Sequence, residues 1–135
     1  SDRVVTLRPL LVSKLPENNQ FHNFFQIALD CWAWGQDVAS LIICWSVIEI
    51  LLLEIIRKKD RNEAEDIKKK KSWMQPLVHK ASQLGIVTHA EKDLLLEIID
   101  IRNKAAHKHI IPPKEFALDA IKQTIAIVER NYGRL

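Results

Sequence analysis

Apolar side chains recur every three or four positions over the stretch between residues 20 and 34. They are Phe21, Phe24, Phe25, Ala28, Leu29 and Trp32. This spacing places them on one face of a helix, and Gly35 is suited to end it. The same spacing predicts a last helix over residues 114–132, with an inner face formed by Phe116, Ala117, Ala120, Ile121, Ile125 and Val128.

Residues 36–59 predict a second helix, whose centre, residues 38–56, is apolar on almost every side. Nineteen such residues approach the length of a membrane span. Glu49 and Glu54 oppose that interpretation, because a carboxylate at bilayer depth is costly. A helix that is apolar all round is also typical of the centre of a helical bundle. We therefore expect a buried helix and no membrane association.

Residues 60–71 form a charged connector, of which residues 62–71 could continue as a polar helix. A third helix is predicted over residues 72–84 and is closed by Gly85. Thr88 and Glu91 then have the spacing of a capping box, which marks the start of a fourth helix. We expect that helix to run over residues 89–109, before Pro112 and Pro113 end the helical pattern.

The chain has only three glycines in 135 residues, so long stretches contain no helix breaker. The sequence predicts an all-α fold, a four- to five-helix antiparallel up-down bundle over residues 20–135. An irregular N-terminal arm, residues 1–19, precedes it. Residues 4–7 there suit an extended segment or a short strand, and Pro9 and Pro16 exclude a helix across them.

The positive charge is concentrated in one segment. Residues 57–71 contain eight Lys or Arg and four acidic residues, whereas the formal charge of the whole chain is +3. Such a segment attracts polyanions, although a solvated loop between helices has the same composition. Cys31 and Cys44 have no paired spacing and lie in apolar helical stretches. They are interpreted as buried free thiols in a cytoplasmic protein.

The hexapeptide at residues 102–107 carries the most distinctive chemistry. Arg102 can neutralise a phosphate and His107 can move a proton, which are the two requirements of phosphodiester cleavage. On a helix Asn103 and His107 share a face, but Arg102 and His107 lie about 140° apart. A purely structural role is the alternative, with Arg102 paired to an acid and His107 placed favourably at the helix C-terminus.

The stretch Arg102-Asn103-Lys104-Ala105-Ala106-His107 resembles the signature of the HEPN superfamily, in particular its bacterial DUF4145-like members. That signature is an Arg, usually followed by a polar residue such as Asn, and then a His after a short spacer. An apolar helix with an internal acid, a basic connector and a motif late on the penultimate helix strengthen the resemblance, which covers residues 20–132.

The resemblance implies a symmetric homodimer with the motif in the cleft between subunits. It also implies a metal-independent endoribonuclease that uses the RNA 2′-hydroxyl as nucleophile and needs no cofactor. His107 would be the general acid or base, Arg102 would stabilise the phosphorane, and Asn103 would orient a phosphate or the imidazole. Such a protein would be a toxin or phage-defence effector with an antitoxin partner, or the nuclease module of a longer chain with flanking domains.

Accessory residues follow from the same resemblance. Glu49 would hydrogen-bond Arg102, and Ser46 is a weaker candidate one turn earlier; a partly exposed helix carboxylate is the alternative for Glu49. The residues expected to contact RNA phosphates are Lys104, Lys108, His109, Lys68, Lys69, Lys70 and Lys71.

Two further groups of side chains have simpler interpretations. The four tryptophans, Trp32, Trp34, Trp45 and Trp73, are expected in the core or at the dimer interface, with base stacking as an alternative for Trp73. The histidines do not form a ligand pattern with Cys or acidic residues, so no metal site is predicted. Two non-nuclease alternatives remain: a HEPN-like module that binds a protein or nucleotide without catalysis, and a plain helical dimerisation domain.

Overall fold

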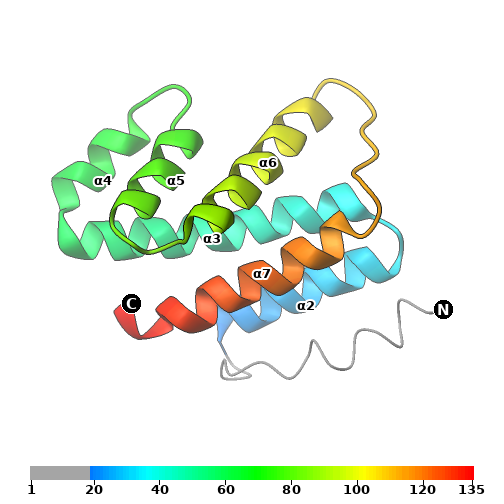
Figure 1. Cartoon of the computed structure of the whole chain (residues 1–135), viewed down its shortest axis with the longest axis horizontal. Coiled ribbons are helices and arrows are strands. Elements are labelled where there is room, and N and C mark those ends of the chain that lie inside the picture. Colours follow the sequence, from blue (N-terminus) through cyan, green and yellow to red (C-terminus); the bar gives the residue numbers. More distant parts are fainter. Residues whose placement is uncertain (1–18) are drawn as a thin grey trace.

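The computed structural model describes residues 19–135, and within them every regular element is a helix (Figure 1). The predicted all-α class is thereby confirmed. The predicted N-terminal arm lies, apart from Asn19, outside the described residues. The elements are α2 (Gln20–Ala33), α3 (Asp37–Lys59), α4 (Arg61–Lys68), α5 (Met74–Gln83), α6 (His89–Ala105), α7 (Phe116–Asn131) and a 3₁₀ turn (Tyr132–Arg134).

Polar caps start three of these helices. The Asn19 side chain accepts a hydrogen bond from the Phe21 N–H at 2.8 Å, and Asp60 caps α4 in the same way. The capping box predicted at Thr88 and Glu91 is present in both directions. Each cap satisfies N–H groups that the helix itself leaves without a partner. Local sequence therefore fixes where α2, α4 and α6 begin.

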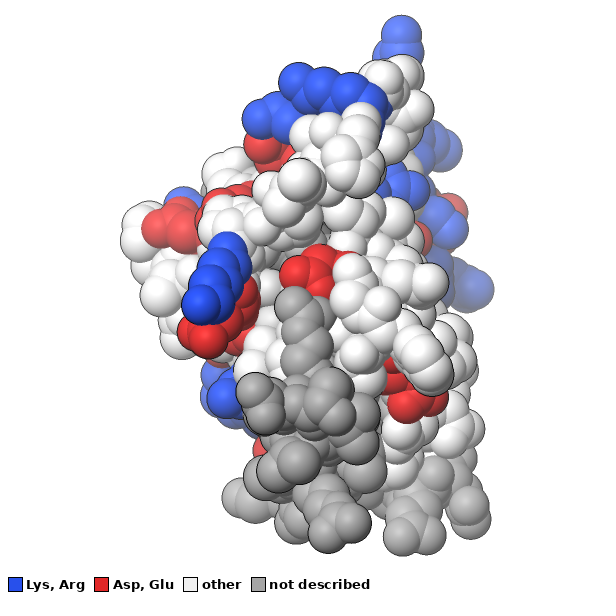
Figure 2. Space-filling view, turned by 90° about the vertical axis from the view of Figure 1, so that its right-hand side faces the viewer, with Lys and Arg blue, Asp and Glu red and all other residues white. Residues whose placement is uncertain are grey.

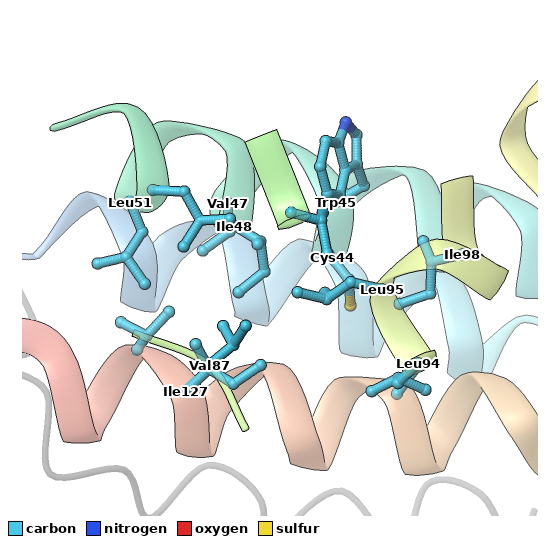
Figure 3. Packing of buried hydrophobic residues seen from close by; sticks show 14 of the residues in the cluster. Cys44, Trp45, Val47, Ile48, Leu51, Val87, Leu94, Leu95, Ile98 and Ile127 are labelled. Atoms are coloured by element: carbon cyan, nitrogen blue, oxygen red, sulfur yellow. The ribbon is translucent and has the colours of Figure 1, made fainter. Parts of the chain in front are cut away.

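Helix α3 runs through the middle of the described chain, with α2 and α7 on one side and α4, α5 and α6 on the other (Figure 1). Its buried side chains point in all directions. In Figure 3, Cys44 and Ile48 of α3 lie between Leu95 of α6 and Ile127 of α7. This arrangement explains why the α3 sequence is apolar on nearly every side: most of its surface meets another helix, and only positions such as Ile42 and Glu54 are exposed.

Among the described helices, α3 alone is long and apolar enough to cross a membrane. Most of its apolar stretch is, however, buried inside the fold. This is the pattern of the core helix of a soluble protein, as the sequence predicted.

The charged connector contains a separate helix, α4, which the sequence predicted only as a possible polar continuation. Asp60 has an extended backbone, which ends α3, and its side chain starts α4. Ala64 and Ile67 are buried against the core. The described chain thus has six α-helices, one more than the largest number predicted.

The fourth predicted helix is shorter than expected, because α6 ends at Ala105 and not at His109. The N–H groups of His107 and Lys108 both bond the Lys104 carbonyl, at 3.0 and 3.1 Å, which closes the helix in a tight last turn. Beyond it, a residue that precedes proline is disfavoured in helical backbone, and the chain must cross to α7. The motif histidine consequently lies past the helix end.

The other end of α6 is clamped by the C-terminal part of α7. The Arg130 guanidinium donates to both carboxylate oxygens of Glu91, one at 2.9 Å, and to the Ile86 carbonyl at 3.2 Å. Asn131 donates to the same carbonyl at 2.9 Å. These bonds tie α7 to the turn before α6 and so fix the direction in which α6 leaves the core.

Candidate functional site

Arg102 lies on the last turn of α6, half-buried beside the core residues Ile98 and Ile101. Burial raises the pKa of the Glu49 carboxyl group in the middle of α3, and the positive charge of Arg102 partly opposes that rise. The structure therefore brings Arg102 and the predicted accessory acid near each other across the α3–α6 contact. Neither of the two acids nearest to it on its own helix, Glu97 and Asp100, forms an ion pair with Arg102 in the described structure.

Glu49 is half-buried, and burial raises the pKa of its carboxyl group above the usual value. Three weaker effects favour the charged form: the Trp45 indole N–H and the positive charges of Arg102 and Lys68. Desolvation outweighs them, because a partly buried carboxylate loses much of its hydration. Glu49 is thus a desolvated acid whose charged form is favoured first by Trp45 of its own helix and then by cations on α6 and α4.

Trp45 is buried one helical turn before Glu49. Its Nε1 has no hydrogen bond of normal geometry, although the N–H acts on the Glu49 carboxylate closely enough to lower the pKa of that group. In Figure 3 the indole nitrogen lies at the end of the ring that is farther from Ile127. A buried N–H donor needs an acceptor, and the Glu49 carboxylate is the group on which this donor acts.

His107 is exposed in the turn that follows α6. The predicted angle of about 140° between Arg102 and His107 applies only to a continuous helix. Because α6 ends at Ala105, His107 is not on the helix and that prediction was wrong. No hydrogen bond joins these two side chains within the described residues. The imidazole is accessible to solvent and to a second molecule.

The remaining motif positions and Ser46 are arranged as follows. Asn103 and Lys104 are exposed, and the Lys104 ammonium pairs with Asp100 at 2.8 Å. The Ser46 hydroxyl is directed back into its own helix, donating to the Ile42 carbonyl at 3.0 Å. Ser46 therefore has its hydrogen bond without any contribution from a ligand.

The predicted lysine run ends α4 and forms the turn before α5, where Lys68, Lys69, Lys70 and Lys71 are all exposed. Figure 2 views the end of the molecule formed by the α2–α3 turn and the loop after α6. Lys and Arg side chains gather along its upper edge. In Figure 1 that edge carries the α4–α5 turn and the C-terminal end of α6. The basic run and the motif thus share one side of the molecule.

A cleft of about 750 Å³ separates the α2–α3 turn and the first turn of α3 from the loop after α6. Two of the residues predicted to bind substrate, Lys108 and His109, line this cleft. The predicted catalytic residues Arg102, Asn103 and His107 are not among its lining residues. The structure therefore places Arg102 and Lys68 near Glu49, and Lys108 and His109 in the cleft, while Asn103 and His107 belong to neither group.

The sequence placed all four tryptophans in the core or at a dimer interface and did not single out Trp34 as the exposed one. Trp32 and Trp45 are in the core as predicted, and Trp73 is partly buried, but the Trp34 side chain is 84% exposed. The available signal was its position: it directly precedes Gly35, outside the apolar face that Trp32 completes. Within the described residues no group of three His, Cys, Asp or Glu side chains is gathered as metal ligands usually are.

No family model matches this sequence, and no curated protein or solved structure is significantly similar to it. The function must therefore be inferred from the residues of the chain itself.

Proposed function

We propose that this protein is a HEPN-type, metal-independent endoribonuclease that acts as a homodimer in the cytoplasm. The placement of Arg102 supports this most directly. A guanidinium at the end of α6 lies in the field of a half-buried acid on α3, close to the basic run at Lys68 and five positions before the exposed His107. A stabilised cation, an accessible imidazole and a basic surface together suit cleavage of a phosphodiester.

The proposed reaction needs only groups that the protein and RNA supply. His107 accepts the proton of the 2′-hydroxyl as its oxygen bonds to phosphorus, and the P–O5′ bond breaks. The leaving 5′-oxygen receives a proton from the His107 of the second subunit. Arg102 stabilises the negative charge of the phosphorane, and Asn103 orients a phosphate oxygen. The products are a 2′,3′-cyclic phosphate and a 5′-hydroxyl.

The homodimer is part of this proposal, as is the antiparallel up-down arrangement of a HEPN bundle. The apolar run of α3 gives no support for a dimer, because its side chains are mostly buried inside one subunit. The reason that remains is chemical: two subunits would bring two copies of Arg102 and His107 to one cleft. A toxin or phage-defence role, an antitoxin and further domains of a longer chain are possible settings for this activity.

The first test is cleavage of RNA in the presence of EDTA. Wild-type protein should cleave, whereas Arg102→Ala and His107→Ala should each lose at least about 100-fold in rate, since general acid–base catalysis alone contributes that much. A matched DNA oligonucleotide should remain intact, because it lacks the 2′-hydroxyl. Gel separation of the products and detection of the cyclic phosphate measure the outcome.

Two substitutions on other parts of the surface serve as matched controls. His89 is an exposed histidine at the opposite end of α6, and Arg134 is an exposed arginine in the 3₁₀ turn. His89→Ala and Arg134→Ala should cleave at the wild-type rate. Cleavage that survives in both Arg102→Ala and His107→Ala would exclude the proposed chemistry.

Mixed dimers test the shared cleft. A heterodimer of wild-type and His107→Ala subunits retains both copies of Arg102 but only one imidazole, so it lacks either the general base or the general acid and should be far less active than half of the wild-type rate. Sedimentation of the wild-type protein should give twice the 15.6 kDa of one chain. A heterodimer that retains half of the wild-type rate would show that each subunit acts alone and not across a common cleft.

A non-catalytic HEPN-like module is the second candidate. The observation that favours it is the separation of Lys108 and His109, which line the cleft, from Arg102 and His107, which do not. A nucleotide held in the cleft without contact to the motif would be bound and not cleaved. Binding of RNA by folded wild-type protein, with no cleavage of any RNA, would favour this function.

A further inference from the structure

The cleft beside α3 has an exposed aromatic residue at its edge. Trp34 ends α2 and directly precedes Gly35, the first of the lining residues. Its backbone is held by a closed turn, in which the Trp34 N–H bonds Asp30 at 3.2 Å and the Gln36 N–H bonds Cys31 at 2.8 Å. Gly35 adopts a φ of 77°, which other residues rarely do. The indole is thus presented to solvent from a fixed position.

The opposite wall of the cleft carries an ammonium group and an imidazole. Lys108 and His109 line it and are exposed, and Ile111 beside them is 82% exposed. Asp37 is the acid in the lining, and it lies in the first turn of α3, where the helix N-terminus stabilises its carboxylate. An exposed aromatic ring next to the cleft, with an ammonium group and an imidazole in the lining, suits a base and its phosphate.

We propose that this cleft is a binding subsite for one nucleotide of single-stranded RNA, with its base stacked on Trp34 and its phosphate bound by Lys108 and His109. The volume of about 750 Å³ is within the range of small-ligand sites. Lys108 follows His107 directly, so RNA held here lies next to the catalytic residue named above. This subsite adds a substrate contact to the proposed nuclease. The choice of RNA as its ligand rests on that proposed function.

Charge favours RNA over a protein partner at this surface. Exposed apolar side chains such as Trp34 and Ile111 are also found where proteins dock. Here Lys108 lies in the cleft lining as well, and the same end of the molecule carries a basic upper edge (Figure 2). An aromatic side chain can stack on any base, so the site would bind RNA without preference for sequence.

Binding of a 2′-O-methyl RNA oligonucleotide, which cannot be cleaved by 2′-hydroxyl attack, tests the subsite separately from catalysis. Trp34→Leu keeps an apolar side chain and removes the ring, so it should weaken binding about 5- to 150-fold. Trp34→Phe keeps a ring and should retain most of the affinity. Ile27→Ala, at an exposed apolar position on α2, should bind like wild type. Fluorescence anisotropy of a labelled oligonucleotide measures all four proteins.

The phosphate contact is tested by salt dependence. Lys108→Ala should reduce the slope of log affinity against log salt by about 0.7, the value for one phosphate contact to a single strand. Lys108→Arg should restore that slope. An unchanged slope in Lys108→Ala would remove the phosphate contact from the proposal.

The outcomes separate the subsite from the nuclease. Cleavage by Trp34→Leu with wild-type kcat and KM would overturn the subsite and leave the nuclease intact. Loss of oligonucleotide binding in Trp34→Leu, with a wild-type protein that never cleaves, would support the subsite and overturn the nuclease. Equal binding by Trp34→Leu and wild type, or dissociation of a dimer by Trp34→Leu with RNA affinity unchanged, would assign this surface to protein contacts and overturn the subsite.

Discussion

At the scale of single residues, Glu49 is the clearest conflict between stability and function. A half-buried carboxylate on the core helix costs free energy, and burial raises its pKa accordingly. The same carboxylate lies in the field of Arg102 and is acted on by the otherwise unpartnered Trp45 N–H. Within the proposed function, Glu49 is a positioning residue: it acts through Arg102 and does not touch the RNA.

Glu49→Gln should therefore affect activity and stability in opposite ways. Loss of the charge should lower kcat about 10- to 100-fold, because Arg102 is no longer held in place. The same change should leave the free energy of unfolding at pH 7 equal to or above that of wild type, since desolvation of a charge is avoided. RNA cleavage and urea unfolding are the measurements.

The free energy of unfolding of the wild type and of Glu49→Gln should also differ in its dependence on pH. The pKa of Glu49 is higher in the folded than in the unfolded protein, so the folded state binds the proton more tightly. The wild-type protein should lose stability relative to Glu49→Gln as pH rises from the unfolded pKa through the folded one. Below the unfolded pKa the two should be alike. A Glu49→Gln protein that is clearly less stable than wild type at pH 7 would contradict this account.

At the scale of elements, α6 is fixed at its N-terminal end and open at its C-terminal end. The capping box and the Arg130 clamp hold the first turn, whereas the last turn leads into an exposed loop that carries His107. Burial would raise the pKa of Glu91, but hydrogen bonds from Arg130 and Thr88 outweigh it and lower the pKa. The clamp therefore sets the direction of the helix that carries the motif.

Arg130→Met should destabilise the protein by about 1–2 kcal/mol, because it removes charge-assisted hydrogen bonds to a largely buried carboxylate. Arg130 is itself 45% exposed on its side chain, which keeps the loss at that level. Arg134→Met, an exposed arginine of the same C-terminal segment, should change stability little. Urea unfolding at pH 7 measures both.

The same clamp has a defined pH range. The pKa of Glu91 is lower in the folded than in the unfolded protein, so its contribution is present above the unfolded pKa and is lost as pH falls through the folded one. The difference between wild type and Arg130→Met should accordingly shrink in acid. A difference that grows below pH 4 would show that the clamp does not act through the ionised carboxylate.

At the scale of the whole molecule, one helix connects the two sides of the fold. Helix α3 contacts α2, α4, α5, α6 and α7, so its side chains become accessible when the packing around it opens. Cys44 lies at the centre of this helix, and burial raises its pKa to about 12 in spite of a hydrogen bond with Thr124. A thiol in this state is unreactive, because only the thiolate attacks.

Cys44 should therefore report global unfolding. In a Cys31→Ser protein, which retains Cys44 alone, a thiol reagent should react at least about 1,000-fold more slowly in buffer than in urea, as expected for a folded domain. The rate should rise with urea in parallel with the unfolding equilibrium. Cys44→Ser, with half-buried Cys31 as its thiol, is the matched comparison and should react faster in buffer. Rapid modification of Cys44 without urea would show that α3 is exposed by local motion.

The sequence by itself determined the helices and the composition of the core. The apolar stripes of α2 and α7, the capping box of α6 and the buried nature of α3 follow from periodicity and from local caps, which depend on residues a few positions apart. The same local information indicated the motif at Arg102 and His107 and the acid at Glu49. It also named Lys108 and His109.

Only the tertiary structure decided how these residues are grouped. The clamp of Arg130 on Glu91 and the burial of Ala64 and Ile67 of α4 depend on contacts between segments distant in sequence. The end of α6 at Ala105 and the exposure of Trp34 also became clear only in the structure. Helical periodicity fixes angles within one element, but the packing of one element against another sets which side chains meet. For that reason the cleft beside α3 could not be read from the chain, although two of its lining residues could.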